Sequence, residues 1–198
     1  AMKKDSVVPK TWLTNIEDKK TIKLAKNEAT KLVINQDESI LEINNRNNTK
    51  TLTNALFNRP IQLRLIKDVE DPRYNQIFLM PIIEYNNIYD GFTFGTKVYN
   101  KTLLRKKLIY KFSPQYATKS KTLTGSTTIS YTHNLENQDL FNITYGIGAS
   151  YSSFDENAFV TVITPTLSFN FRDDTNFRSN KNQYLGFFPI VILPSPEA

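Results

Sequence analysis

Cysteine is absent from this chain of 198 residues, and histidine occurs once, at His133. The lack of cysteine excludes disulfide frameworks, thiolate catalysis and cysteine-ligated zinc or iron–sulfur clusters. A single histidine cannot supply a two-histidine metal triad, an HExxH zinc site or a histidine pair for acid and base catalysis. We therefore expect no catalytic residue, no metal and no cofactor in this chain, and we expect that it is not an enzyme.

Long hydrophobic runs are missing as well. The longest apolar stretch, 185–193, is about half of the ~20 residues that a membrane-spanning helix requires. No apolar run of secretory length follows the charged opening at 1–6, so we expect no signal peptide in the sequence as it stands. With 6 Gly, 9 Pro and 39% hydrophobic residues, the composition excludes collagen-like, coiled-coil and disordered classes. The length predicts one domain with, at most, a small appendage.

From residue 77 onward, apolar and polar residues alternate with a period of two. The clearest segment is 141–152, where Phe, Ile, Tyr and Ala at odd positions alternate with Asn, Thr, Gly and Ser. The other segments with this pattern are 77–86, 92–99, 108–117, 123–132, 159–171 and 183–193. Such alternation is typical of antiparallel strands. We predict an all-β fold over 77–198, an up-and-down meander of about seven strands joined by short turns.

The residue types at the two sets of positions distinguish two interpretations. The polar positions hold Ser, Thr, Asn and Gly with few charges, and the apolar positions are rich in aromatic residues. The wet face of a soluble sheet normally carries many Lys and Glu, whereas a membrane barrel has an apolar, aromatic-rich outside and a polar inside. We therefore favour part of an outer-membrane-type β-barrel in contact with lipid or detergent. The alternative is a soluble β-barrel that binds a lipid or another apolar ligand inside.

The period of two also assigns side chains to faces of the predicted sheet. One face is expected to carry Phe141, Ile143, Tyr145, Ile147, Tyr151, Ile163, Leu167, Phe169 and Phe171. The other is expected to carry Thr144, Ser150, Thr166 and Ser168.

The N-terminal part of the chain has a different composition, rich in Lys, Asn, Thr and Glu. A hairpin is predicted over 22–34, around a turn at 25–29. The mixed segment 52–66 is predicted to be a helix that Pro60 interrupts. We expect residues 1–76 to form a small β-containing appendage and junction, and residues 77–198 to form the meander.

A series of motifs runs in order along the chain. They are EINNRNN at 42–48, EDPRYNQI at 70–77, EYNNIYDGF at 84–92, Gly95, YNKTLL at 99–104, YKFSPQY at 110–116 and KSKTLTG at 119–125. Together they resemble the barrel portion, with the end of the preceding region, of large gluzincin-type zinc aminopeptidases of Bacteroidetes. The resemblance covers roughly residues 12–188 and implies an outer-membrane anchor for a surface or periplasmic peptidase.

Two departures from that family limit what the resemblance implies. The family's catalysis needs an HExxH helix with a further glutamate ligand, and nothing here matches it, so no catalytic residue carries over. The C-terminal residues, LPSPEA at 193–198, also differ from the aromatic-terminated strand on which a complete barrel usually closes. We therefore expect a fragment or a truncated relative whose role is structural and not hydrolytic.

Three groups of residues could carry chemistry. Asp155–Glu156 and Asp173–Asp174 are paired carboxylates that could bind calcium, but they lack EF-hand spacing, and we expect them to be solvated turn residues. His133 is expected to be a satisfied or interfacial side chain, because it has no second histidine with which to bind a metal.

The third group is basic and lies in 91–135, a stretch without Asp or Glu. Its members are Lys97, Lys101, Arg105, Lys106, Lys107, Lys111, Lys119 and Lys121. Consecutive turns of a meander fall at opposite ends, so the turns at 100–107 and 118–121 are expected at opposite rims. Such a distribution suits lipid headgroups or solvation, and we expect no nucleic acid as a partner.

An open meander of about seven strands has two unpaired edges, which invite pairing with other strands. We predict one of two arrangements. Either a hairpin from the first 58 residues joins the sheet, or two chains pair edge to edge.

Overall fold

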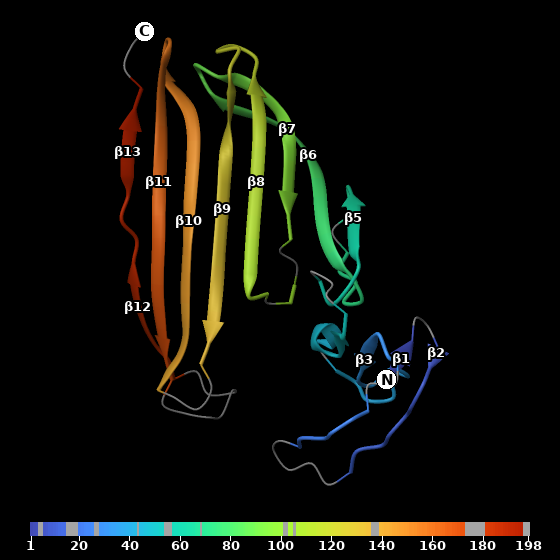
Figure 1. The fold of residues 1–198 in the computed structure, drawn as a ribbon. Coiled ribbons are helices and arrows are strands. Elements are labelled where there is room, and N and C mark those ends of the chain that lie inside the picture. The colour runs from blue at the N-terminus through green and yellow to red at the C-terminus, as the bar shows by residue number, and fades with distance from the viewer. Residues whose placement is uncertain are drawn as a thin grey trace. The chain divides into compact units, whose positions relative to one another are not determined.

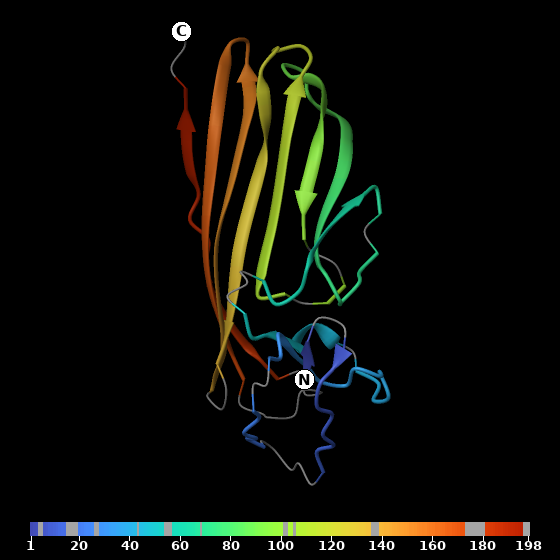
Figure 2. The same cartoon turned by 45° about the vertical axis from the view of Figure 1, so that its right-hand side comes forward.

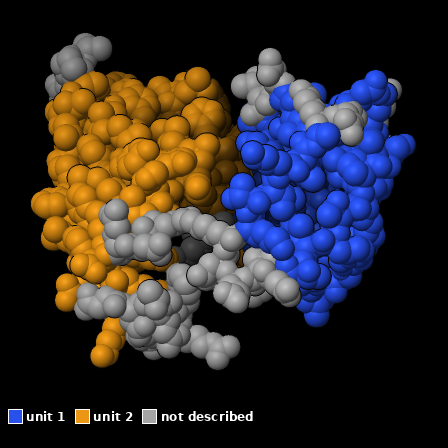
Figure 3. Space-filling view, turned by 60° about the horizontal axis from the view of Figure 1, so that its bottom comes forward, with its two compact units in different colours: residues 1–62, 71–76 blue, residues 63–70, 77–198 orange. Residues whose placement is uncertain are grey.

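The computed structural model describes residues 1–3, 6–14, 20–25, 28–42, 44–53, 57–67, 69–100, 103–104, 106–135, 139–172 and 181–195. Within them the fold is all-β, with two sheets and one short 3-10 helix, η1 (Asn45–Asn47). The chain divides into two compact units, Ala1–Gln62 with Asp71–Gln76, and Leu63–Glu70 with Ile77–Ala198 (Figure 3). No described helix has the length and apolar character needed to cross a membrane.

The small sheet belongs to the first unit and has the order β2-β1-β3-β4. Its strands are β1 (Met2–Lys3), β2 (Ser6–Val7), β3 (Lys31–Val33) and β4 (Thr49–Thr51). The predicted hairpin over 22–34 is wrong, because 20–25 form no strand and β3 pairs instead with β1 and β4. Both neighbours of β3 come from distant positions in the chain, and local composition does not encode such pairing.

The large sheet contains nine strands (Figures 1 and 2). They are β5 (Ile61–Leu65), β6 (Asn75–Asn87), β7 (Gly91–Tyr99), β8 (Leu108–Ala117), β9 (Leu123–Asn134), β10 (Leu140–Asp155), β11 (Ala158–Phe171), β12 (Gln183–Phe187) and β13 (Val191–Pro194). From β6 to β12 each strand pairs with the next in an antiparallel meander. The predicted meander of about seven strands over 77–198 is confirmed: its segments correspond to β6–β11 and to β12 with β13, and β5 adds a further strand beside β6 from outside that range.

The predicted helix over 52–66 is wrong, because residues 61–65 form strand β5. Residues 61–65 alternate, with Ile61, Leu63 and Leu65 exposed and the polar residues between them half-buried. Pro60 has no N–H to donate, but its carbonyl accepts a hydrogen bond of 2.8 Å from Asn75 N at the start of β6. The period of two and this pairing with β6 override the helix-like composition. Residues 54–56 of the predicted helix lie outside the described residues.

Strands β12 and β13 were predicted as one strand, and they occupy one position in the sheet. Phe187 pairs with Leu167, and Val191 pairs with Ile163. Counting inward from both pairs places Pro189 opposite Pro165. Neither proline has an N–H, so the hydrogen-bond ladder is interrupted there. Nine strands with two sharing one position leave eight strand positions.

The large sheet is open in the part of the chain that the structure describes. Strand β5 lies at one edge, and β12 with β13 lies at the other. The strands within the first 58 residues form their own sheet, so the predicted arrangement in which a hairpin from this region joins the large sheet is wrong. Pairing between two chains stays a prediction.

Candidate functional site

The long strands present two chemically different faces, as the sequence predicts. Directly paired residues lie on the same side of a sheet. Ile143 pairs with Phe169 and Tyr145 with Leu167, whereas Thr144 pairs with Ser168. The predicted assignment of side chains to faces is therefore confirmed for the paired residues of β10 and β11; Phe141 lies in a register irregularity between Leu140 and Asn142, and the pairing does not assign it to a face.

The pair registers extend both faces over β6–β11. We call the side that carries Tyr85, Phe94, Phe112, Ile129, Tyr145 and Leu167 the apolar face. We call the side that carries Glu84, Thr93, Gln115, Ser126, Thr144 and Ser168 the polar face.

Burial on the two faces is the reverse of that in a water-soluble sheet. On the apolar face, Phe112, Tyr145 and Ile147 are 53%, 50% and 48% exposed. On the polar face, Thr93, Ser113 and Ser168 are 0%, 2% and 8% exposed. Large apolar side chains are normally among the most buried and polar ones among the most exposed. The sheet therefore directs its apolar side chains outward.

Aromatic pairs lie on the apolar face. Tyr85 and Phe92 contact each other beside the β6–β7 turn, with ring centroids 5.5 Å apart. Tyr151 and Phe159 stack beside the β10–β11 turn, with centroids 5.4 Å apart. Both hairpins turn at the same end of the meander, so these rings lie near one rim. Aromatic residues gather in this way at the interfaces of membrane barrels.

Polar side chains on the polar face bond to one another across strands. Gln115 Nε2 on β8 donates to Glu84 Oε1 on β6 at 2.8 Å, and the bond passes over β7. Gly95 of β7 permits this approach, because a Cβ there would lie 2.8 Å from Gln115 Cγ and 2.1 Å from the Pro114 carbonyl oxygen. Farther along the face, the Thr132 and Thr144 hydroxyls are 2.9 Å apart.

A buried carboxylate joins three segments at one rim of the sheet. We call Asn86, Asn87, Asp90, Ser120 and Ser153 the Asp90 cluster. Asp90 is fully buried and accepts hydrogen bonds from Ser153 Oγ (2.6 Å), Ser153 N (3.1 Å), Ser120 Oγ (2.8 Å), Asn86 Nδ2 (2.8 Å) and Asn87 Nδ2 (3.3 Å). Asn87 Nδ2 also donates to the Ser153 carbonyl at 2.9 Å. The cluster ties the β6–β7 and β8–β9 turns to β10.

Hydrogen bonding sets the charge state of Asp90. Burial of the carboxylate would raise its pKa, but hydrogen bonds from Ser153, Ser120 and Asn86 outweigh burial and hold the pKa below its ordinary value. Asp90 is thus a buried anion stabilised by neutral donors.

The Asp90 cluster also requires a curved sheet. Strands β7 and β10 are three positions apart. In a flat sheet they would be separated by three steps of about 4.8 Å, or roughly 14 Å. Direct hydrogen bonds between Asp90, which immediately precedes β7, and Ser153 on β10 therefore require the rim to curl or the turn to fold over it, and Figure 2 shows the long strands in a curved arrangement.

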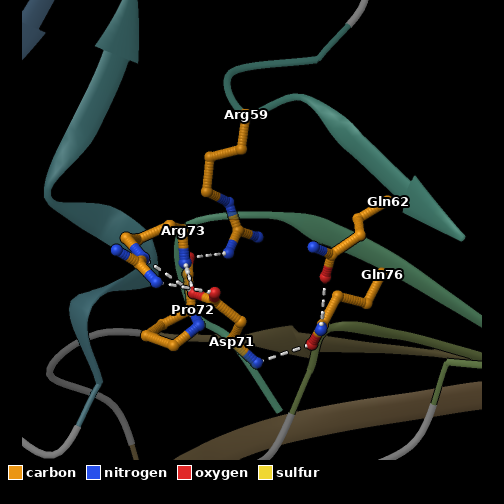
Figure 4. A network of polar contacts seen from close by, with 6 residues as sticks. All are labelled: Arg59, Gln62, Asp71, Pro72, Arg73 and Gln76. Carbon is orange, nitrogen blue, oxygen red and sulfur yellow. Dashed lines mark hydrogen bonds and ion pairs between the residues drawn. The ribbon is translucent and has the colours of Figure 1, made fainter. Parts of the chain in front are cut away.

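A second polar network lies in the first unit (Figure 4). Arg59 donates to the Pro72 carbonyl at 2.6 Å, and Gln76 bridges Asp71 N and Gln62 Oε1 at 2.7 and 2.8 Å. Arg73 forms a two-bond ion pair with Asp71, which raises the Arg73 pKa. These hydrogen bonds join the loop before β6 to residues in or next to β5 and β6, so the network fixes the segment that leads into β6.

The acidic and histidine candidates from the sequence are not brought together. Asp155 and Glu156 are exposed at the β10–β11 turn, and Asp173–Asp174 lies outside the described residues. His133 is exposed on the apolar face, opposite Ile143. Among the described residues, no three His, Cys, Asp or Glu side chains form a group that could hold a metal ion.

The basic candidates separate into three places. Lys119 and Lys121 lie at the rim that holds the Asp90 cluster, and Lys106 and Lys107 lie beyond the other end of β8. The prediction that the two basic turns lie at opposite rims is confirmed. Lys97 and Lys111 instead lie within strands, and Lys101 and Arg105 lie outside the described residues.

Sequence reasoning missed the Asp90 cluster and the placement of Lys97 and Lys111 on the polar face. Asp90 stands in a run, NNIYDG at 86–91, that indicates only a turn, and its partner Ser153 is 63 residues away. The parity of Lys97 and Lys111, shared with Thr93 and Ser113, was the signal for their position.

No protein-family model matches this sequence, and no curated protein or solved structure matches it either. A functional conclusion therefore rests on the fold and on the distribution of side chains over the two faces of the large sheet.

Proposed function

We propose that the large sheet forms part of an outer-membrane-type β-barrel that anchors a larger surface or periplasmic protein in the lipid. The observation that carries this proposal is the reversed burial of the two faces, with apolar side chains outward and hydroxyl and amide side chains inward. In lipid, the exposed apolar face would contact hydrocarbon, and the polar face would line an interior.

The dimensions of the sheet support the proposal. Strands β6, β9, β10 and β11 contain 13, 12, 16 and 14 residues, and a tilted membrane strand needs about 9–11. Bacterial single-chain barrels have even strand numbers from eight upward, and this sheet has eight strand positions. Strand β5, however, runs parallel to β6 and to the β12–β13 edge (Figure 1), so closing the sheet onto itself would place two parallel strands side by side and interrupt the antiparallel pattern.

The proposed role is anchoring and not hydrolysis. The sequence contains no HExxH motif, and its one histidine is exposed on the apolar face. The parent suggested by resemblance is a gluzincin-type zinc aminopeptidase, and any substrate would belong to its catalytic region. The partner of this chain is then membrane lipid, with no nucleic acid.

The alternative, a soluble barrel with an apolar ligand inside, has one supporting observation. Phe78, Met80 and Ile82 of β6 stand on the polar face, and Phe78 is buried. The remainder of that face is dominated by Ser, Thr, Asn and Gly. A ligand cavity is usually lined mainly by apolar side chains, so the face favours the membrane barrel.

The test compares the chain in water and in lipid. The full chain would be refolded in buffer alone and into phosphatidylcholine vesicles, then followed by vesicle flotation, carbonate extraction and protease protection. We expect soluble aggregates in buffer and carbonate-resistant, protease-protected protein in the vesicles. A folded monomer in detergent-free buffer that does not float with vesicles would overturn the proposal and favour the soluble barrel.

A further inference from the structure

Two lysine side chains stand close together on the polar face. Lys97 on β7 pairs with Met80 of β6, and Lys111 on β8 pairs with Tyr99 of β7 and Thr128 of β9. The two lysines are diagonal neighbours across the β7–β8 ladder, a relation in which residues are about 7–8 Å apart. Two ammonium groups can therefore reach a common point above the sheet.

The ammonium groups of Lys97 and Lys111 have no hydrogen-bond or ion-pair partner among the described residues. No carboxylate there forms an ion pair with Lys97 or Lys111, and no acceptor there bonds to either ammonium group. Along the described strands β6–β11 the polar face carries two carboxylates. Glu84 accepts the hydrogen bond from Gln115, and Asp155 lies at the β10–β11 turn. The local charge around the two lysines is positive.

A hydroxyl without a partner lies between them. The register of the flanking pairs places Ser113 of β8 opposite Lys97, and Lys111 precedes Ser113 by two residues on the same face. Ser113 is 2% exposed, and within the described residues its Oγ has no hydrogen-bond partner. Buried hydroxyls are nearly always hydrogen-bonded, so the Ser113 O–H is available to donate to a ligand at this position.

We propose that Lys97, Lys111 and Ser113 bind a doubly charged tetrahedral oxyanion, such as phosphate or sulfate, on the polar face. Two ammonium groups match two negative charges, and the Ser113 O–H donates to a third oxygen. Ser126, which pairs with Ser113, and Thr128, which pairs with Lys111, supply further hydroxyls beside the position. The lysine stems are flexible and partly exposed, so they can move to admit the anion.

This site differs from the membrane anchor in face and in chemistry. Lipid would contact the apolar face, whereas the anion binds on the opposite side. Anion binding and vesicle association are therefore separate measurements on the same sample, and either can fail without the other.

Isothermal titration of the refolded full chain with inorganic phosphate, sulfate and acetate tests the proposal. We expect saturable binding of phosphate and sulfate and at least tenfold weaker binding of acetate, because acetate carries a single charge. Lys97→Gln and Lys111→Gln should each weaken phosphate binding about tenfold, and Ser113→Ala should weaken it by a smaller factor. Lys107→Gln, an exposed rim lysine, is the matched control and should leave the affinity unchanged.

Conservative variants separate loss of charge from loss of fold. Lys97→Arg and Lys111→Arg keep the charge and should retain binding within a few fold. Circular dichroism under the conditions of the titration checks that each variant keeps its strands. The proposal is overturned if the parent chain binds no phosphate, or if Lys107→Gln weakens binding as much as Lys97→Gln.

Discussion

The two faces of the large sheet share the same strands but are stabilised in different ways. The polar face holds cross-strand hydrogen bonds, such as Gln115 to Glu84, and most of its side chains are partly or fully buried. The apolar face holds aromatic pairs whose rings remain open to the surroundings. Of the large apolar side chains in this unit, Phe78 alone is fully buried among the described residues.

This difference indicates which solvent suits the sheet. Hydrophobic stabilisation in water is roughly proportional to the apolar area removed from contact with water. An exposed apolar face contributes little of that kind, so the sheet in water relies on its ladder and its polar contacts. Contact with hydrocarbon would remove the apolar face from water.

The first prediction places one charge on either face of β10. Tyr145→Lys puts an ammonium group on the apolar face, and Thr144→Lys puts the same group on the polar face one residue away. A lysine on the lipid side near the midplane costs about 2–4 kcal/mol. We expect Tyr145→Lys to lose about that much folding free energy in reversible urea unfolding from vesicles, and Thr144→Lys to lose much less. Equal losses would contradict the assignment of the apolar face to lipid.

The second prediction concerns the Asp90 cluster, which belongs to neither face alone. Asp90→Asn removes a buried anion that five hydrogen-bond donors stabilise. Hydrogen bonds to a charged group are worth about 1.5–3 kcal/mol each, and the amide keeps some of them. We expect a loss of about 2 kcal/mol, measured as a lower urea midpoint with an unchanged slope. Asp155→Asn, an exposed carboxylate at the adjacent turn, is the control and should change the midpoint little.

The pKa of Asp90 gives this contribution a pH dependence. The folded-state pKa is lowered, so the stabilisation is fully present above the unfolded value of about 3.9. It is lost as the pH falls through the folded pKa, because the protonated carboxyl no longer accepts all of these bonds. Parent chain and Asp90→Asn should therefore converge in stability toward acid pH. A constant difference between pH 7 and strongly acid conditions would contradict the role of the charge.

The third prediction tests the close approach on the polar face. Gly95→Ala would place a Cβ 2.1 Å from the Pro114 carbonyl oxygen and 2.8 Å from Gln115 Cα. Backbone must shift to relieve this contact, so we expect a loss of about 1–2 kcal/mol. Gly148→Ala has its closest contact, at 2.5 Å, with the Thr164 side-chain oxygen, which can rotate away. The second variant should lose less, as measured by the same urea unfolding.

How much of the fold could be predicted from the sequence depends on how far apart in the chain the interacting residues lie. The period of two in β10 predicts both the strand and its faces, because the alternation is local and uninterrupted. Strand β5 was predicted as part of a helix because its five residues follow Pro60 in a mixed segment, and its pairing with β6 outweighs that local signal. The interruption between β12 and β13 depends on Pro189 meeting Pro165, which requires the register to be known.

The candidate sites were less predictable than the strands. Asp90 contacts Ser120 and Ser153, which are 30 and 63 residues away. No pattern of composition encodes such a contact, because it depends on the curvature of the whole meander. The lysines were grouped by their closeness in sequence, although their parity already separates Lys97 and Lys111 from the rim residues.

The last prediction concerns the edge formed by β12 and β13, whose residues all remain exposed except Gly186. Unpaired edge strands invite pairing, and an added lysine discourages it.

Because the chain lacks cysteine, single cysteines report the partner cleanly. Ile192→Cys should form disulfide-linked dimers in detergent if two chains pair at this edge. Leu63→Cys combined with Leu193→Cys, both on the apolar face, should instead give an intramolecular bond if β5 closes the sheet. In the otherwise unchanged chain, Ile192→Lys should abolish pairing of two chains at this edge, seen as a shift to monomer in light scattering. Folding stability should change by less than about 1 kcal/mol. A monomeric parent chain, together with cysteine variants that form neither disulfide, would show that both edges remain unpaired.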